Sequence, residues 1–214
     1  MSRARALWLE ARHRLKARLT PPLPCPERCD GRREVYREGP WLGDKESPDQ
    51  RDLNEALGEL VSAESRILHV GVGASGLAVR WAGSVRRIDG LTLLEPEARY
   101  AVALGLPGYE VAIADKYRSL PVSGPYELIV DNNLSSFSCC RSHFREMFAG
   151  YVRLLAPDGV ILTHTRGLTY AARGGFGMTV EELGALAGEH GLALRRRGEV
   201  IALERPQNGM SSTG

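Results

Sequence analysis

Five short apolar runs recur along the chain from residue 66 onward, and this alternation restricts the fold more than any other feature. The segments that follow the runs have the character of helices or loops. Buried parallel strands read as nearly continuous apolar runs, and parallel neighbours need helical crossovers. The pattern predicts a doubly wound α/β sheet, in which ligands bind at the carboxyl ends of the strands. The expected strands are 66–70, 91–95, 109–114, 126–131 and 159–164, and the expected helices between them are 77–81, 97–104 and 142–155.

The last part of the sheet is predicted to be antiparallel. A helical segment at 179–191 is followed by two β-type runs that Arg197-Gly198 separates, which is typical of a hairpin. The chain is therefore expected to form a mostly parallel, seven-stranded sheet that ends in an antiparallel hairpin. A dinucleotide-binding fold would instead continue with further right-handed βαβ units.

The glycine-rich turn after the first strand fits two kinds of nucleotide. The sequence RILHVGVGASGLA, residues 66–78, contains G-x-G-x-x-G after an apolar run. That spacing is the fingerprint of dinucleotide-binding enzymes. Together with the hairpin, the chain resembles the class I S-adenosylmethionine (SAM)-dependent methyltransferases over residues 66–204. The resemblance implies a Rossmann-like methyltransferase fold and SAM as the cofactor.

In that family the first strand ends in an acidic residue, which G-x-G-x-G follows. Gly71 and Gly73 match this pattern, and a side chain at either position would block close approach of the backbone to a ligand. Val72 and Ser75 complete the expected cofactor-binding turn, with Ser75 in place of the third glycine. His69 stands where the acid is usual, so another carboxylate or a water has to bind the amino group of the methionine part.

Two carboxylates further along are predicted to bind the nucleoside. Glu95 follows four mostly apolar residues and is expected at the carboxyl end of the second strand, where a carboxylate accepts both ribose hydroxyls. The alternative for Glu95 is an acid at a helix N-terminus, which the helix dipole favours. Asp115 follows the third strand, at the position where the family binds the amino group of adenine.

Asp131, Asn132 and Asn133 follow the fourth strand and are predicted to lie near the transferred methyl group. Buried polar groups need partners, so the triplet indicates a binding site, with an Asx-stabilised turn as the alternative. Asp131 is expected to contact the cofactor, and the two asparagines the acceptor. Some small-molecule O-methyltransferases bind Mg²⁺ with an acid at this position, and Mg²⁺ prefers oxygen ligands. A Mg²⁺ site at Asp131 and Asn132 is therefore implied, although the fifth strand ends in His164 where a partner acid is usual.

Two histidines are predicted catalytic residues. Methyl transfer to a hydroxyl requires removal of its proton, and an imidazole that titrates near neutrality is a suitable base. His143, at the start of the 142–155 helix, is the preferred base. His164 is the second choice or an acceptor-binding residue, and Asp131 or a metal-bound hydroxide is the remaining alternative.

The 130–160 stretch, which reads DNNLSSFSCCRSHFREMFAGYVRLLAPDGV from Asp131 onward, resembles bacterial sugar O-methyltransferases of methylmannose-polysaccharide biosynthesis. The resemblance implies a mannoside acceptor and transfer of the methyl group to one of its hydroxyls. Tyr36 and Trp41 are predicted to contact the sugar from a lid, because flat apolar rings suit sugar faces, and a core anchor is the alternative for Trp41. The alternative functions are an RNA or another small-molecule methyltransferase, and a SAM-binding protein without catalysis.

Composition limits the partners. With 214 residues and 25% charged residues the chain has the size and composition of one globular domain. A net charge of +2 gives no reason to expect nucleic acid or a membrane surface, so the expected partner is a small-molecule or oligosaccharide acceptor. A homodimer is compatible with the sequence and is not dictated by it. The sequence contains neither a transmembrane-length apolar run nor a signal peptide, and we expect a cytoplasmic protein.

Three regions are predicted along the chain. Residues 1–60 form an N-terminal helical and lid extension, with a helix over about 47–61 that Ser47 or Asp49 caps. Residues 61–205 form the methyltransferase domain, and 206–214 a loose tail. The four cysteines lack zinc-site spacing and are expected to be reduced thiols.

Overall fold

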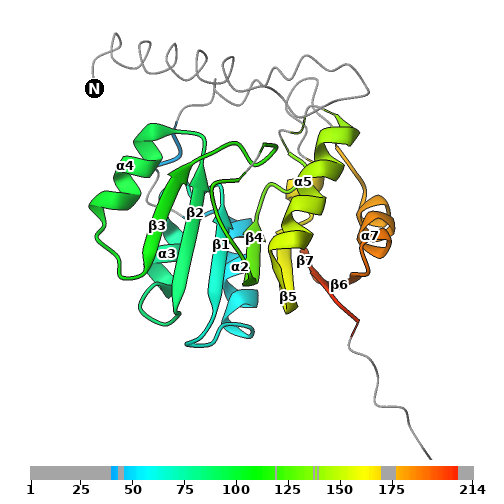
Figure 1. Cartoon of the computed structure of the whole chain (residues 1–214), viewed down its shortest axis with the longest axis horizontal. Helices are drawn as coiled ribbons and strands as arrows, with labels where there is room; N and C mark the ends of the chain where they lie inside the picture. The colour runs from blue at the N-terminus through cyan, green and yellow to red at the C-terminus, as the bar shows by residue number, and fades with distance from the viewer. Residues whose placement is uncertain are drawn as a thin grey trace, which may run out of the picture.

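The computed structural model describes residues 40–42, 46–118, 120–136, 138, 140–169 and 177–206. Seven strands form one sheet in the order β3-β2-β1-β4-β5-β7-β6, which runs from left to right in Figure 1. The first five strands are parallel, and β7 is antiparallel to both β5 and β6. The predicted mostly parallel sheet with a closing antiparallel hairpin is confirmed.

The strands are β1 (Arg66–Val70), β2 (Arg87–Thr92), β3 (Tyr109–Ile113), β4 (Tyr126–Asp131), β5 (Leu155–His164), β6 (Ala193–Arg197) and β7 (Val200–Glu204). The helices within the described ranges are α2 (Pro48–Gly58), α3 (Gly76–Trp81), α4 (Glu95–Ala103), α5 (Arg141–Leu154), α6 (Arg166–Thr169) and α7 (Val180–Glu189). None of these helices has both the length and the apolar character needed to span a bilayer.

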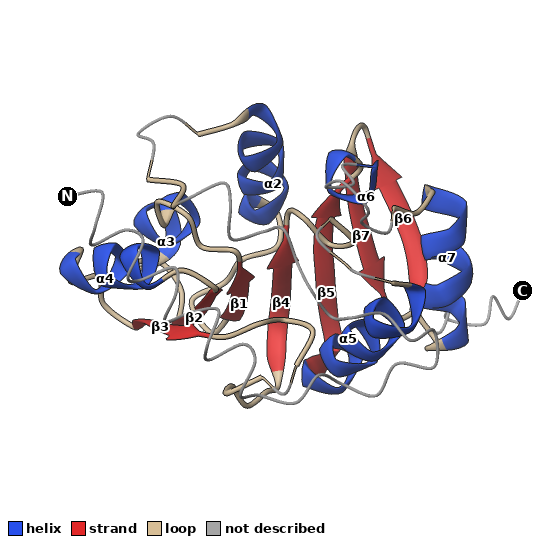
Figure 2. Cartoon of the chain, turned by 90° about the horizontal axis from the view of Figure 1, so that it is seen from above, coloured by secondary structure: helices blue, strands red, loops and turns tan. Residues whose placement is uncertain are grey.

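Helices cover both faces of the sheet, each over its own apolar cluster. Leu53 and Leu57 of α2 join Leu77 of α3 in the cluster on one face. The cluster on the other face contains Phe148 of α5 and Leu186 of α7. Figure 2 shows α2 and α3 on one side of the sheet and α5 on the other. α2 therefore contributes to the same apolar core as the strands.

β2 lies earlier in the chain than its predicted range of 91–95. The strand includes Asp89, which is buried but accepts a hydrogen bond from the Tyr126 hydroxyl at 2.7 Å and pairs with Arg87 at 2.8 Å. It also includes Gly90, where a Cβ atom would lie 2.7 Å from Val72 Cγ1. These two residues interrupt the apolar run, and the predicted strand therefore begins later in the chain than the observed start at Arg87. Glu95 is consequently the first residue of α4 and not the end of β2, so its predicted strand position is wrong.

The connection between α5 and β5 also differs from the prediction. The helix ends at Leu154 and β5 begins at the next residue, so Pro157 and Asp158, which lie before the predicted strand 159–164, are inside the ten-residue strand. A register shift between β4 and β5, opposite Tyr126 and Leu128, accommodates this irregular start. The apolar part of β5 then runs in regular register with Ile129 and Val130, and it ends at His164 as predicted.

Candidate functional site

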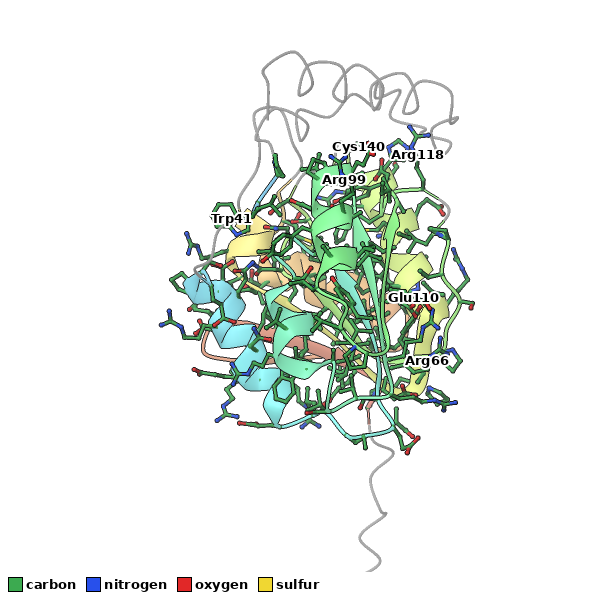
Figure 3. The ribbon with its side chains drawn as sticks, turned by 90° about the vertical axis from the view of Figure 1, so that its left-hand side faces the viewer. Trp41, Arg66, Arg99, Glu110, Arg118 and Cys140 are labelled. Atoms are coloured by element: carbon green, nitrogen blue, oxygen red, sulfur yellow. The ribbon has the colours of Figure 1, made fainter. Side chains whose placement is uncertain are left out.

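The described part of the chain contains a pocket of about 550 Å³ at the carboxyl ends of the parallel strands. The strand register brings its walls together, because Val70 at the end of β1 is paired with Leu91 of β2 and with Asp131 of β4. The strand order reverses between β1 and β4, which is where open α/β sheets bind ligands. In Figure 3, Trp41 lies toward the upper end of the molecule, whereas Arg66 at the start of β1 lies toward the lower end.

The pocket has two sides. We call the first the glycine-loop side, which consists of Gly71, Gly73, Thr92, Glu97 and Asp115. We call the second the α2 side, which consists of Ser47, Asp49, Gln50, Asn132 and Arg166. The remaining lining residues are Trp41, Pro48, Val70, Leu91, Leu93, Leu94, Ala114, Lys116, Tyr117, Asp131 and Asn133.

The glycine turn has the backbone conformation that its sequence predicts. Gly71 and Gly73 both line the pocket, and both have positive φ angles, of 78° and 49°. A Cβ atom at Gly73 would lie 3.1 Å from Trp41 Cδ1, so the turn is also closely covered by the 40–42 segment. Gly71 is exposed and Gly73 is buried beneath Trp41, and the absence of side chains at both positions allows a ligand to approach the backbone closely.

The other residues of this loop face away from the pocket lining. Ser75 adopts the left-handed conformation of the glycine it replaces, with φ of 61°, but its buried hydroxyl lies 3.0 Å from the Tyr109 hydroxyl. Val72 is buried under Gly90. His69 lies behind the loop on β1, and its Nδ1 has no hydrogen-bond partner among the described residues. Burial lowers the pKa of His69 to about 4, so the ring is neutral near pH 7.

A carboxylate that the sequence interpretation missed stands at the end of β2. Thr92 is the last residue of the strand, and its hydroxyl donates to Glu97 Oε2. Glu97 is buried in the first turn of α4, and its Oε1 accepts the Trp41 backbone N–H at 2.9 Å. Glu97 lines the pocket, and the predicted ribose ligand Glu95 is not among the lining residues. A signal for Glu97 was present in the sequence. Glu97 lies two residues after Glu95 in the first turn of α4, on the side of the helix that faces the end of β2.

Asp115 lies beside the end of β2, because the Ala114 N–H donates to Thr92 O at 2.8 Å. Asp115 Oδ1 accepts the Tyr117 N–H at 3.0 Å, and its Oδ2 lies 3.5 Å from Arg118 Nε. The carboxyl group is therefore fixed in place at the pocket wall where the sequence placed it.

Asp131 is tied into a buried network. Lys116 Nζ donates to Asp131 Oδ2 at 2.7 Å and to the carbonyl of Asn133 at 2.6 Å, which joins the loop after β3 to the loop after β4. The Tyr151 hydroxyl donates to the same Oδ2 at 2.9 Å, and the Asn133 N–H donates to Oδ1 at 3.1 Å. Burial and the nearby Asp131 charge raise the pKa of Tyr151 well above its ordinary value, so this phenol remains a donor.

These contacts do not suit the predicted Mg²⁺ site. Both oxygens of Asp131 already accept hydrogen bonds, and Lys116 places a positive charge at the position a cation would take. Asn132 donates its amide to Asp49. Among the described residues, no group of three His, Cys, Asp or Glu side chains is arranged to hold a metal ion. The described residues around Asp131 therefore do not fit a Mg²⁺ ion.

Neither predicted histidine lines the pocket. His143 is buried in the first turn of α5, with its Nδ1 3.4 Å from Cys140 Sγ. His164 is buried at the end of β5, where its Nδ1 accepts the Arg166 N–H at 3.1 Å and its Nε2 lies 3.3 Å from Asp52 Oδ2. Because Nδ1 is an acceptor, Nε2 carries the proton and donates to Asp52, so both ring nitrogens of His164 are engaged. The structure does not bring these two rings to the lining.

Asn132, Asn133 and Trp41 line the pocket, as expected for acceptor contacts, whereas Tyr36 lies outside the described residues. The structure adds two charged residues to this region that sequence reasoning missed. Asp49 of α2 accepts the Asn132 amide, and its Oδ1 lies 3.4 Å from Arg166 Nη1. The α2 side is thus a carboxylate held between an amide and a guanidinium.

Comparison with known proteins gives the fold. No protein-family profile and no curated protein sequence matches the chain. Among solved structures, the N-methyltransferase NodS from Bradyrhizobium japonicum WM9, in complex with S-adenosyl-L-homocysteine, matches with a TM-score of 0.61 at 18% identity, over 76% of this chain and 90% of NodS. A TehB-like SAM-dependent methyltransferase from Corynebacterium glutamicum matches with a TM-score of 0.55 at 18% identity, over 72% of this chain and 87% of that chain.

The cyclopropane synthase MmaA2 from Mycobacterium tuberculosis also matches, with a TM-score of 0.56 at 21% identity, over 68% of this chain and 61% of that chain. At these identities the common property is the fold. The chain therefore has the Rossmann-like methyltransferase fold that its sequence predicted. The names of the three proteins describe different reactions, so the reaction of this chain has to be argued from its own pocket.

Proposed function

We propose that this chain is a SAM-dependent O-methyltransferase that transfers a methyl group to a hydroxyl of a small acceptor, and that the acceptor is a sugar such as a mannoside. The cofactor would supply an electrophilic methyl group on a positively charged sulfonium. The residues that would hold it are those of the glycine-loop side, and the residues that would face the acceptor are those of the α2 side.

The charge of the pocket is the observation that carries this proposal. Four carboxylate residues line it, namely Asp49, Glu97, Asp115 and Asp131, against the two cations Lys116 and Arg166. A sulfonium is attracted by such an excess of negative charge, whereas the pyrophosphate of a dinucleotide carries two negative charges and is repelled. The antiparallel β7 supports the same choice, because the dinucleotide-binding fold continues with parallel units.

Each part of SAM has a matching group on the glycine-loop side. The backbone at Gly71 and Gly73, which carries no side chains, suits the methionine part, which passes close to the turn. The pair formed by Thr92 and Glu97 offers a hydroxyl and a carboxylate to the ribose hydroxyls, in place of the predicted Glu95. Asp115 accepts a hydrogen bond from the amino group of adenine. His69 is neutral and does not replace the acid that binds the methionine amino group in the family.

Polar groups on the α2 side support a sugar acceptor. Gln50 and Asn132 offer amides and Asp49 offers a carboxylate, and two further lining residues, Asn133 and the half-exposed Trp41, add an amide and an aromatic face. This mixture suits a ligand with many hydroxyls and one apolar face. The near-balanced net charge of +2 favours such a neutral acceptor over RNA, which needs a basic footprint.

A calorimetric titration followed by a transfer assay tests the proposal. SAM and S-adenosyl-L-homocysteine are expected to bind, and NAD⁺ is not. Labelled methyl is then expected to pass from SAM to methyl α-D-mannopyranoside, and to remain transferable in excess chelator. Binding of NAD⁺ in preference to SAM would overturn the cofactor. Binding of SAM with no transfer to hydroxyl compounds would leave a SAM-binding protein without this activity.

A further inference from the structure

The α2 side brings together three side chains from three separate elements. Asp49 comes from the first turn of α2, Asn132 from the loop after β4, and Arg166 from the start of α6. Asn132 Nδ2 donates to Asp49 Oδ2, and Arg166 Nη1 lies 3.4 Å from Asp49 Oδ1. All three line the same pocket as the glycine turn. The carboxylate therefore faces the space next to the predicted cofactor.

The position of Asp49 is fixed by the packing of its helix. Ser47 caps α2 and forms a capping box with Gln50, which sets where the first turn begins. Leu53 and Leu57, one and two turns further on, are buried in the sheet core. Asp49 is thus held at the pocket by the same core that holds the strands, and its side chain remains 16% exposed.

The partners of Asp49 are fixed as well. A Cβ atom at Gly167 would lie 1.8 Å from Asn132 O, so α6 and the Asn132 loop are in direct backbone contact. The Ser135 and Ser136 N–H groups both donate to Gly167 O at 3.1 Å, which locks the two segments together. Arg166 precedes this contact, and its side chain is 68% exposed at the pocket mouth.

The other carboxylates of the pocket are held in place by neighbouring groups. Asp131 accepts from Lys116 and Tyr151, and Glu97 accepts from Thr92 and the Trp41 backbone. Asp115 accepts the Tyr117 N–H and lies 3.5 Å from Arg118 Nε, whose side chain is 17% exposed. The partners of Asp49 differ, because one is an exposed guanidinium at a long distance, and that contact exchanges readily with water or a ligand.

We propose that Asp49 is the catalytic base of this protein, and that Asn132 and Arg166 are the residues that position it. The inference rests on the proposed methyl transfer. An oxygen lone pair of the acceptor hydroxyl forms the new C–O bond as the C–S bond of the sulfonium breaks, and the bonding pair stays on sulfur as a neutral thioether. The hydroxyl proton passes to the Asp49 carboxylate and from there to water.

A carboxylate is strong enough for this step. As the C–O bond forms, the hydroxyl oxygen gains positive charge and becomes far more acidic than a carboxylic acid. Burial alone would raise the pKa of Asp49, but hydrogen bonds from Asn132 and Ser47 and the charge of Arg166 together lower that pKa. Asp49 is therefore ionised throughout the neutral range, with the permanently charged Arg166 as the charged group that faces it.

Asp49→Asn tests the base, because it removes the charge and keeps the shape and the acceptor oxygen for the Asn132 amide. Glu55→Gln on the exposed face of the same helix is the matched control. With methyl α-D-mannopyranoside and catechol as hydroxyl probes, Asp49→Asn is expected to lose kcat by about 10²–10⁴-fold. The SAM dissociation constant and the melting temperature are expected to stay near the wild-type values, and Glu55→Gln to keep full activity.

The pH profile separates this base from an imidazole. Wild-type kcat is expected to be constant between about pH 6 and 8, because a carboxylate base is already ionised there. An imidazole base would instead make kcat rise with pH through about 6.5. Full activity of Asp49→Asn beside an active wild type would overturn the base and leave the proposed function intact. A rate that rises through pH 6.5 and disappears in His143→Ala or His164→Ala would also overturn it. Failure of the wild-type protein to bind SAM would instead overturn the proposed function.

Discussion

The glycine-loop side and the α2 side of the pocket face one another, but they are built from different parts of the protein. The glycine-loop side presents mainly backbone, at Gly71 and Gly73, and carboxylates that are held by neighbours close in the fold. The α2 side presents only side chains, and these are brought together over separations of 83 residues from Asp49 to Asn132 and 117 residues from Asp49 to Arg166. A turn fixes the first side, and the tertiary structure fixes the second.

This difference predicts whether a substitution changes cofactor binding or the transfer step. Under the proposed function, a substitution on the glycine-loop side changes SAM binding, and a substitution on the α2 side changes the transfer step. The Lys116–Asp131 ion pair joins the loops after β3 and β4, between the two sides, and a change there affects both.

The largest effect is expected from breaking that ion pair. Asp131 is 1% exposed and Lys116 is 11% exposed, so Asp131→Ala leaves a buried ammonium without its carboxylate. The free energy of unfolding, measured by urea denaturation, is expected to fall by about 3–5 kcal/mol. Glu110→Ala, which breaks a pair whose carboxylate is 72% exposed, is the control and is expected to change it by less than about 1 kcal/mol. Equal effects of the two variants would show that the Lys116–Asp131 ion pair contributes no more to the free energy of unfolding than the exposed pair does.

The second prediction separates Glu97 from Glu95. Glu97→Gln is expected to weaken SAM binding by on the order of 1.5–3 kcal/mol, the worth of a hydrogen bond to a charged group. Glu95→Gln is expected to leave SAM affinity unchanged, because Glu95 is not among the pocket-lining residues. Calorimetry on the two variants decides the assignment, and the reverse outcome would return the ribose contact to Glu95.

The third prediction disturbs the α2 side alone. Gly167→Ala places a Cβ atom against Asn132 O, where only 1.8 Å is available, so α6 and its Arg166 must move. Overpacking of this kind is expected to lower the free energy of unfolding by about 1–3 kcal/mol. The rate of methyl transfer is expected to fall. The SAM dissociation constant, measured at a temperature at which both proteins are fully folded, is expected to stay within a few fold of the wild-type value. A parallel loss of SAM binding and transfer would mean that the two sides are not separable.

The last prediction concerns His69 behind the glycine loop, whose effect develops only below pH 6.5. Its pKa is lowered from 6.5 to about 4 by burial, so below pH 6.5 the unfolded chain binds a proton that the folded chain does not. The free energy of unfolding is therefore expected to fall as the pH falls from 6.5 toward 4, by at most about 1.4 kcal/mol per pH unit from this group. His69→Gln should lack this part of the slope. Identical slopes for the two proteins would place the protonation elsewhere.

Local sequence signals were sufficient for most of the sheet and for the glycine turn. Apolar runs marked most strands, and the Arg197-Gly198 turn marked the hairpin that distinguishes the two nucleotide folds. β2 was misplaced because Asp89 and Gly90 look like loop residues, and only tertiary contacts to Tyr126 and Val72 make them strand residues. That shift moved the expected ribose carboxylate from Glu97 to Glu95.

On the α2 side the sequence indicated Asn132 as an acceptor contact, but no local signal placed α2 or Arg166 beside it. Asp49 was read as a helix cap, and nothing local indicates that the helix lies against Asn132. His143 and His164 were chosen because imidazole chemistry suits a base, but their burial and their partners depend on packing that residue type does not reveal. The sequence patterns indicated which residue types suit each role. The position of each side chain depends on contacts between distant segments, which those patterns do not reveal.

The location of α2 before the first strand has a consequence for how such proteins diversify. The eleven residues Pro48–Gly58 enter the molecule ahead of the sheet, and they reach the pocket without belonging to any crossover of the nucleotide-binding framework. Under the proposed function, a related chain that kept residues 66–204 and carried a different helix here, with apolar residues in place of Leu53 and Leu57, would keep the groups that bind SAM and contact a different acceptor. Exchange of α2 between related chains is accordingly expected to change which acceptor is methylated.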